Sequence, residues 1–137
     1  MSRKSARAAA VQMVYEQMLG GEGGEETLRG LIEFTPEEDD QAYINSLLKG
    51  VADRAEELDG QIEKCLKGWT LDRLSRVDLA IMRLAAWELM LGEDPTGAII
   101  NEAVELANQF STDKAGGFVN GVLGNLARAL DDAEAKA

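Results

Sequence analysis

The sequence has 137 residues, a formal net charge of −11, one cysteine and no histidine. A chain of this length fits a single domain with its own core, which we expect to span residues 1–137. One cysteine excludes an intramolecular disulfide framework, and the missing histidine excludes the usual Cys/His zinc sites and Ser–His–Asp triads.

The first predicted helix covers about residues 4–19. Its apolar residues recur at helical spacing: Ala8, Val11, Val14, Tyr15, Met18 and Leu19. Three cations lie in or just before its first turns, with no acid among residues 1–15: Arg3, Lys4 and Arg7. Cations at a helix N-terminus oppose the helix dipole, so helix stability does not explain them. They indicate either an anionic partner or a solvated basic end, and both readings stay open.

A glycine-rich loop, 20–24, ends this helix, and a short helix is predicted at about 26–33. Thr35 and Pro36 then form a typical helix start, followed by acids that complement the positive helix end. This placement explains the acidic run 37–40 without a metal site, and no calcium-loop pattern accompanies it. We expect no metal and no cofactor.

Two more helices follow, one that begins at Pro36 and one over about 55–66. Their predicted core residues are Tyr43, Ile44, Leu47, Leu48, Val51, Leu58, Ile62, Cys65 and Leu66. Cys65 is either a nucleophile or a small buried apolar residue, and the absence of a base or oxyanion motif favours burial. Gly50 and Gly60 mark helix breaks or close packing.

The helix predicted at about 76–91 is apolar around most of its circumference, which places it at the centre of the domain. Ser75 begins it in a pattern that resembles a capping box, with Asp78 in place of the usual glutamate. Arg83 and Glu88 interrupt the apolar stretch and need partners if they are buried, and Glu102 is a candidate partner for Arg83. The preceding connector holds Trp69, either an exposed recognition residue or a core anchor, and we expect the core anchor.

The last two predicted helices cover about 95–110 and 115–130, followed by a frayed polar tail, 131–137. Their apolar stripes include Phe110 and Leu130. Glycine destabilises a helix, so Gly117, Gly121 and Gly124 suggest the close approach of another backbone. With no alternating strand pattern, the sequence predicts an all-α fold, a compact bundle of about seven helices. No stretch is a signal peptide or long enough to span a bilayer, so we expect a cytoplasmic protein with no membrane contact.

Four blocks of this sequence resemble the NusB family of bacterial transcription antitermination proteins. They are residues 3–15, 69–89, 98–107 and 118–123, in the family's order and spacing. The resemblance covers about residues 3–130. It implies two packed helical halves, the first formed by helices one to three.

The resemblance also implies a function. Family members bind boxA-type single-stranded RNA together with NusE, a small-subunit ribosomal protein that doubles as a transcription factor. The pair acts with other Nus factors on the elongating RNA polymerase complex and suppresses termination, notably in ribosomal RNA transcription. This role is that of a binding protein and not of an enzyme.

Carried over by position, the resemblance implies two sets of site residues. The RNA-binding set is Arg3, Lys4, Arg7, Gln12, Lys114 and Phe118. The protein-partner set is Tyr15, Asp72, Asp78 and Arg83. Ser5 stands where the family often has another basic residue, and the rest of the chain is strongly acidic. We therefore expect RNA affinity to depend on NusE.

Two other functions are compatible with a helical bundle. One is a protein-interaction module or homodimer that binds no RNA. The other is an accessory domain of an RNA methyltransferase, because NusB-like domains also precede such enzymes. The length of the chain leaves no room for a cofactor-binding fold, which argues against the second.

Overall fold

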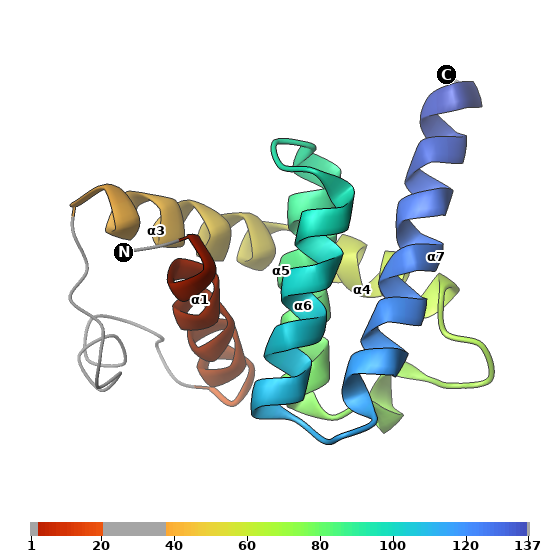
Figure 1. The fold of residues 1–137 in the computed structure, drawn as a ribbon, viewed down its shortest axis with the longest axis horizontal. Coiled ribbons are helices and arrows are strands. Elements are labelled where there is room, and N and C mark those ends of the chain that lie inside the picture. The colour runs from red at the N-terminus through yellow and green to blue at the C-terminus, as the bar shows by residue number, and fades with distance from the viewer. Residues whose placement is uncertain (1–2, 21–37, 137) are drawn as a thin grey trace.

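The computed structural model describes residues 3–20 and 38–136, with side chains described from 5 to 20 and from 41 to 134. Within these ranges the chain forms six α-helices, a short 3-10 helix and no strand (Figure 1). The elements are α1 (Arg3–Met18), α3 (Glu38–Asp53), α4 (Ala55–Lys64), η1 (Leu71–Arg73), α5 (Arg76–Leu91), α6 (Thr96–Phe110) and α7 (Ala115–Lys136). The all-α prediction is confirmed. The helix expected at 26–33 and the start at Thr35 lie outside the described residues.

Helix α5 is the centre of the fold, as its apolar circumference predicts. It packs against all five of the other described helices. The backbone N–H of Asp78 donates to Ser75 Oγ at 3.0 Å, so Ser75 caps the helix as expected. Gly92 ends it in the left-handed conformation, with a φ of 67° that favours glycine.

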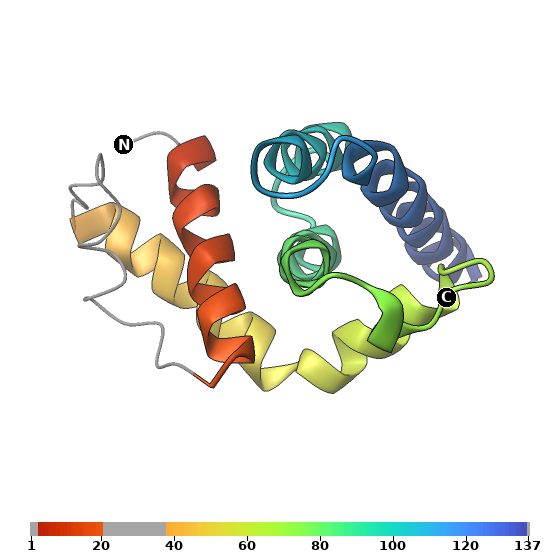
Figure 2. The ribbon, with the colours of Figure 1, turned by 90° about the horizontal axis from the view of Figure 1, so that it is seen from below.

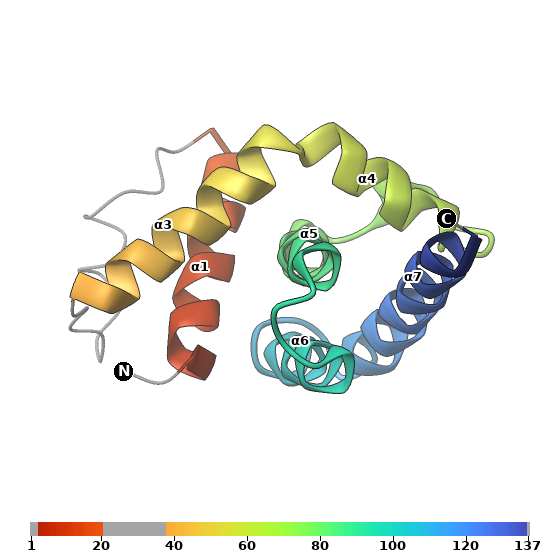
Figure 3. The ribbon, with the colours of Figure 1, turned by 90° about the horizontal axis from the view of Figure 1, so that it is seen from above.

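The other helices surround α5 in two groups. Figures 2 and 3 show α1 and α3 on one side of α5, and α6 and α7 on the other. Helix α4 continues from α3 past α5 and reaches α7, which it also contacts. The two helical halves implied by the family resemblance are therefore present.

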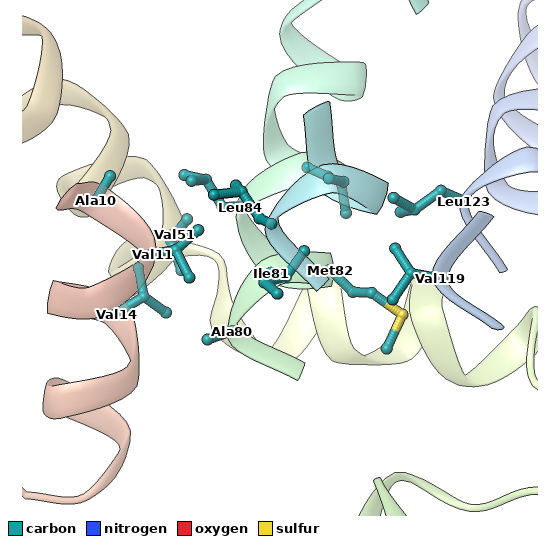
Figure 4. Packing of buried hydrophobic residues seen from close by; sticks show 14 of the residues in the cluster. Ala10, Val11, Val14, Val51, Ala80, Ile81, Met82, Leu84, Val119 and Leu123 are labelled. Carbon is teal, nitrogen blue, oxygen red and sulfur yellow. The ribbon is translucent and has the colours of Figure 1, made fainter. Parts of the chain in front are cut away.

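Apolar side chains from both groups meet on α5. In Figure 4, Ala80 points toward α1, where Val11 and Val14 lie, whereas Met82 points toward Val119 of α7. Ala80, Met82 and Val119 are completely buried. Burial of this kind contributes roughly 25 cal/mol per Å² of apolar surface, so α5 is the main hydrophobic link between the two groups.

The structure corrects several details of the predicted helices. Val11 and Val14 of α1 are buried as predicted, but the buried face also includes Ala6, Ala9 and Ala10, and Leu19 is 53% exposed. Phe110, expected in the α6 stripe, is also exposed. Residues 131–136 are not frayed as predicted, because α7 continues to Lys136.

The glycines behave differently from the prediction. A Cβ at Gly117 or Gly121 would meet nothing within 4 Å, and one at Gly124 would meet only a distal atom of Arg128. The expected close approach of a backbone is therefore wrong. At Gly50, by contrast, a Cβ would overlap the indole ring of Trp87. Glycine at this position lets α3 lie directly against the tryptophan of α5.

Substitution of Gly50 tests this packing. Gly50→Ala inserts a methyl group where the Trp87 ring lies, and we expect a loss of about 1–3 kcal/mol in the free energy of unfolding, as is usual for overpacking. The matched control is Gly60→Ala in α4, where a Cβ meets nothing. The control should gain about 0.5–1 kcal/mol from helix propensity. Urea unfolding measures both, and equal effects would contradict the close packing.

Candidate functional site

Arg7 is buried in a cluster of three acids, which is the strongest polar feature of the described residues. Its Nε lies 2.8 Å from Glu88 Oε2 of α5, and its Nη2 lies 2.5 Å from Asp94 Oδ2 in the α5–α6 connection. Its Nη1 pairs with Glu102 of α6. The side chains of Arg7 and Glu88 are each 6% exposed. One guanidinium therefore joins α1 to three later segments.

The charge state of Arg7 follows from these contacts. Burial alone lowers the pKa of its guanidinium, but the negative charge of Glu88 and smaller contributions from Tyr43 and Asp94 more than offset this, so the pKa is raised. The side chain stays charged at any pH at which the protein is folded. A permanent cation among acids stabilises their ionised forms.

The cluster changes the expected roles of three residues. The resemblance assigns Arg7 to RNA binding, but its donors already point to carboxylates in the protein interior. Glu88, which was expected to need a partner if buried, pairs with Arg7. The expected pairing of Arg83 with Glu102 is wrong, because Arg83 donates to both carboxylate oxygens of Asp59 in α4, at 2.6 and 2.7 Å.

A first surface hollow, of about 510 Å³, lies where α1 passes the start of α5 and the end of α6. We call it the Tyr15 groove, and its lining consists of Val11, Gln12, Tyr15, Glu16, Leu19, Val77 and Phe110. Most of its surface is apolar, with Leu19 53% and Phe110 36% exposed. The groove brings together Gln12 from the expected RNA set and Tyr15 from the expected partner set.

A second hollow, of about 290 Å³, lies on the other side of the start of α5. We call it the Trp69 pocket, and its lining includes Trp69, Arg73, Leu74, Asp78, Lys114 and Phe118. Trp69 is 51% exposed, so the expectation of a core anchor is wrong. Its ring meets that of Phe118 edge to face, with centroids 6.1 Å apart.

Neighbouring residues at the start of α5 line the two hollows. Val77 lines the Tyr15 groove and the next residue, Asp78, lines the Trp69 pocket. Asp78 was expected on the partner surface, yet it lies beside Lys114 and Phe118 of the expected RNA set. The structure therefore does not separate the two expected sets into two faces.

Two further expected site residues, Asp72 and Arg83, line neither hollow. Asp72 is exposed on η1, where its carboxylate accepts a hydrogen bond from Thr70 Oγ1. Arg83 is held by Asp59. Arg3 and Lys4 belong to the first turn of α1, and their side chains lie outside the described residues.

No catalytic arrangement accompanies these hollows in the described part of the chain. Cys65 is buried, and burial raises the pKa of its thiol above the ordinary value of 9.0, which disfavours the reactive thiolate. No group of three metal-ligating side chains occurs among the described residues. None of the described helices is long and apolar enough to cross a membrane.

Comparison with known proteins gives one consistent result. The sequence profile of the NusB family matches residues 4–128. The chain belongs to the NusB family. Transcription antitermination protein NusB of Acetivibrio thermocellus is 42% identical over 130 residues, covering 93% of this chain and 90% of that protein. The NusB of Clostridium novyi is 39% identical over 133 residues, covering 94% of this chain and all of its own length (100%).

Solved NusB structures share the fold. T. maritima NusB superposes with a TM-score of 0.82 at 29% identity, covering 93% of this chain and 92% of its own. A crystal structure of antitermination factors NusB and NusE in complex with double-stranded RNA gives a TM-score of 0.81 at 32% identity. That match covers 93% of this chain and 96% of the other.

The Arg7 cluster leads to a prediction about stability. Arg7→Ala leaves Glu88 buried without its cation, and we expect the free energy of unfolding to fall by about 3–5 kcal/mol. Arg7→Lys keeps the charge but cannot reach three carboxylates as a planar fork does, so it should lose an intermediate amount.

The control for this prediction is Lys49→Ala, which removes an exposed cation from α3. This substitution should change the free energy of unfolding by no more than about 0.5 kcal/mol. Chemical denaturation followed by circular dichroism measures all three variants. If Arg7→Ala were as stable as Lys49→Ala, the cluster would have no structural role.

Proposed function

We propose that the chain is a transcription antitermination factor that binds boxA-type single-stranded RNA together with NusE. The pair acts on the elongating RNA polymerase complex with other Nus factors, notably in ribosomal RNA transcription. The observation that carries this proposal is the match, over nearly the whole chain, to a NusB solved together with NusE and RNA. The RNA in that complex is double-stranded, and the preference for single-stranded boxA RNA comes from the family resemblance.

The proposed RNA surface consists of Arg3 and Lys4 at the start of α1, Gln12 in the Tyr15 groove, and Lys114 and Phe118 in the Trp69 pocket. The cations supply phosphate contacts, and Phe118 offers a ring for base stacking. We leave Arg7 out of this surface because its guanidinium is buried among carboxylates. Arg7 acts instead by holding α1 in place.

The proposed NusE surface is centred on Tyr15. The Tyr15 groove supplies exposed apolar surface of the kind that protein partners cover. The proposed NusE surface also includes Asp72 of η1 and Asp78 of α5, and Arg83, whose pairing with Asp59 joins α5 to α4. Because the Tyr15 groove and the Trp69 pocket share the start of α5, a bound NusE lies next to the RNA.

Three further properties complete the proposal. The chain works as a binding protein without catalysis of its own, and Cys65 serves as a core residue. Residues 1–137 form a single domain. Its place of action is the cytoplasm, where bacterial transcription takes place.

RNA binding with and without NusE tests the proposal. A boxA-type RNA should shift in a gel more strongly with NusE than without it, and more strongly than a scrambled RNA. Lys114→Ala removes one phosphate contact, so the slope of log K against log salt should become shallower by about 0.7 between about 50 and 200 mM salt.

The matched control is Lys49→Ala, an exposed cation on α3 away from both hollows, which should leave the slope unchanged. The alternative function, a protein-interaction module or homodimer without RNA, predicts no shift with any RNA. Failure of NusE to strengthen the boxA shift at either salt concentration would overturn the proposal.

A second test concerns the protein partner. Tyr15→Ala removes an aromatic side chain from the middle of the Tyr15 groove, and we expect NusE affinity to fall by about tenfold or more, the size of an interface hot spot. Leu91→Ala is the control, because Leu91 is also an exposed apolar residue, 38% exposed, at the far end of α5. Calorimetric titration with NusE measures both, and equal affinities would place NusE elsewhere.

A further inference from the structure

A third hollow, of about 530 Å³, lies between α6 and α7, which pack side by side (Figures 1 and 3). We call it the asparagine groove. Its lining consists of three glycines and of Ile100, Asn101, Val104, Asn108 and Asn120. The groove shares no lining residue with the Tyr15 groove or the Trp69 pocket. It is therefore a surface of its own, and its role does not depend on the proposed function.

Three side-chain amides are the polar groups of this groove. Asn101 and Asn108 are seven residues apart on α6, so they lie on one face of the helix, about 10.5 Å apart along its axis. Asn120 lines the groove from α7. All three are exposed, and no hydrogen bond among the described residues uses their amides. Each amide can donate and accept two hydrogen bonds, which matches the N–H and C=O groups of a peptide backbone.

The glycines of the groove leave room for another backbone to come close. A Cβ at Gly97 or Gly117 would meet nothing within 4 Å, so packing within the chain does not require glycine at either position. Glycine lowers the stability of a helix, which leaves these two residues unexplained by the fold. Gly116 differs, because a Cβ there would overlap the amide of Asn108. The backbone of a bound partner accounts for the two open glycines.

The charges of the groove limit what that partner can be. No charged or aromatic residue lines it. Helix α6 carries Glu102 and Glu105 and no cation, on a chain with a net charge of −11. RNA finds neither cations for its phosphates nor a ring for base stacking among the lining residues. A positively charged segment, by contrast, is attracted by the field of the whole chain.

The free amides favour an extended segment over a helix. The backbone N–H and C=O groups of a helix bond to one another, whereas those of an extended segment remain available. From Gly97 to Asn108 the groove follows α6 for about 16 Å, the length of about five extended residues. Alternate side chains of such a segment point to the same side, where the half-buried Ile100 and Val104 lie.

We propose that the asparagine groove binds an extended, positively charged segment of a protein partner other than NusE. The three asparagine amides bond to the backbone of the segment, which gives affinity through main-chain hydrogen bonds. Its apolar side chains face Ile100 and Val104, and its basic side chains, which alternate with them, point to the acidic surroundings. The segment binds while the Tyr15 groove and the Trp69 pocket are occupied, so it adds a second protein to the complex.

Selection from a phage-displayed library of random linear dodecapeptides on the intact chain tests the proposal. We expect it to enrich peptides in which apolar and basic residues alternate. A synthetic copy of an enriched peptide, added to ¹⁵N-labelled protein, should shift the side-chain amide NMR signals of Asn101, Asn108 and Asn120. A copy with N-methylated backbone nitrogens keeps its side chains but loses its N–H donors, so it should bind about tenfold or more weakly.

Substitution of the asparagines tests their role in binding. Asn101→Ala and Asn108→Ala should each weaken the peptide by about tenfold, because each removes an amide that bonds to its backbone. Alanine is the better helix former, so both variants should fold. The matched control is Asn45→Ala, an exposed asparagine of α3, which should bind the peptide like the unchanged protein.

Substitution of the glycines separates binding from stability. Gly117→Ala and Gly121→Ala lie on the same helix, and a Cβ at either position meets nothing within 4 Å. Both variants should therefore have a raised Tm. Only Gly117 lines the groove, so only Gly117→Ala should weaken the peptide, by about fivefold or more. A purely structural role of these glycines predicts equal binding by the two variants.

Four results would overturn the proposal. One is that no peptide is enriched, and another is that NusE displaces the enriched peptide, which places it on the NusE surface. The third is a peptide that Asn101→Ala and Asn108→Ala bind as tightly as the unchanged protein does. The fourth is loss of the boxA shift on Asn101→Ala, which makes the groove an RNA contact. In the first and third cases an intact NusE-dependent boxA shift would leave the proposed function standing.

Discussion

The guanidinium of Arg7 makes the contact on which the arrangement of this molecule depends. It lies in the protein interior, where a charge is costly unless it is paired, and it meets acids from α5, from the α5–α6 connection and from α6. Apolar contacts between α1 and α5 hold the helices together without fixing how far one slides along the other. The ion cluster fixes the position of α1 along α5, because the planar guanidinium of Arg7 fits the carboxylates in few arrangements.

The register matters because the Arg7 cluster and the Tyr15 groove lie at opposite ends of the same helix pair. Arg7 and Tyr15 are about 12 Å apart along α1, and Glu88 and Val77 are about 16 Å apart along α5, at 1.5 Å per residue. Arg7 pairs with Glu88 at one end, and Tyr15 and Val77 line the Tyr15 groove at the other. A shift of α1 by one turn would move Tyr15 away from Val77. The buried arginine thus shapes a surface that it does not touch.

Helical periodicity predicted most of the fold, and its failures have physical reasons. The largely apolar α5, the Ser75 cap and the buried faces of α3 and α4 follow from local spacing. The burial of Arg7 had a signal, because Arg7 stands three, four and seven residues before Ala10, Val11 and Val14 on the buried face of α1. Its acids, however, lie more than 80 residues away. The exposure of Trp69 and the Arg83–Asp59 pair depend on how separate helices meet, which spacing within one helix does not report.

The same geometry explains how so acidic a chain can serve as an RNA-binding protein. With a net charge of −11, long-range electrostatics repel a polyanion, so the few cations near the two hollows give RNA only modest affinity. NusE bound in the Tyr15 groove, as proposed, would lie across the first turn of α5 from the Trp69 pocket, so RNA that contacts both proteins would bind with a raised effective concentration. Thermodynamic linkage makes this effect reciprocal. If NusE raises the affinity of the chain for RNA by some factor, RNA raises its affinity for NusE by the same factor. Repulsion by the acidic surface then favours RNA that contacts both proteins, because RNA that contacts only one of them binds weakly and dissociates.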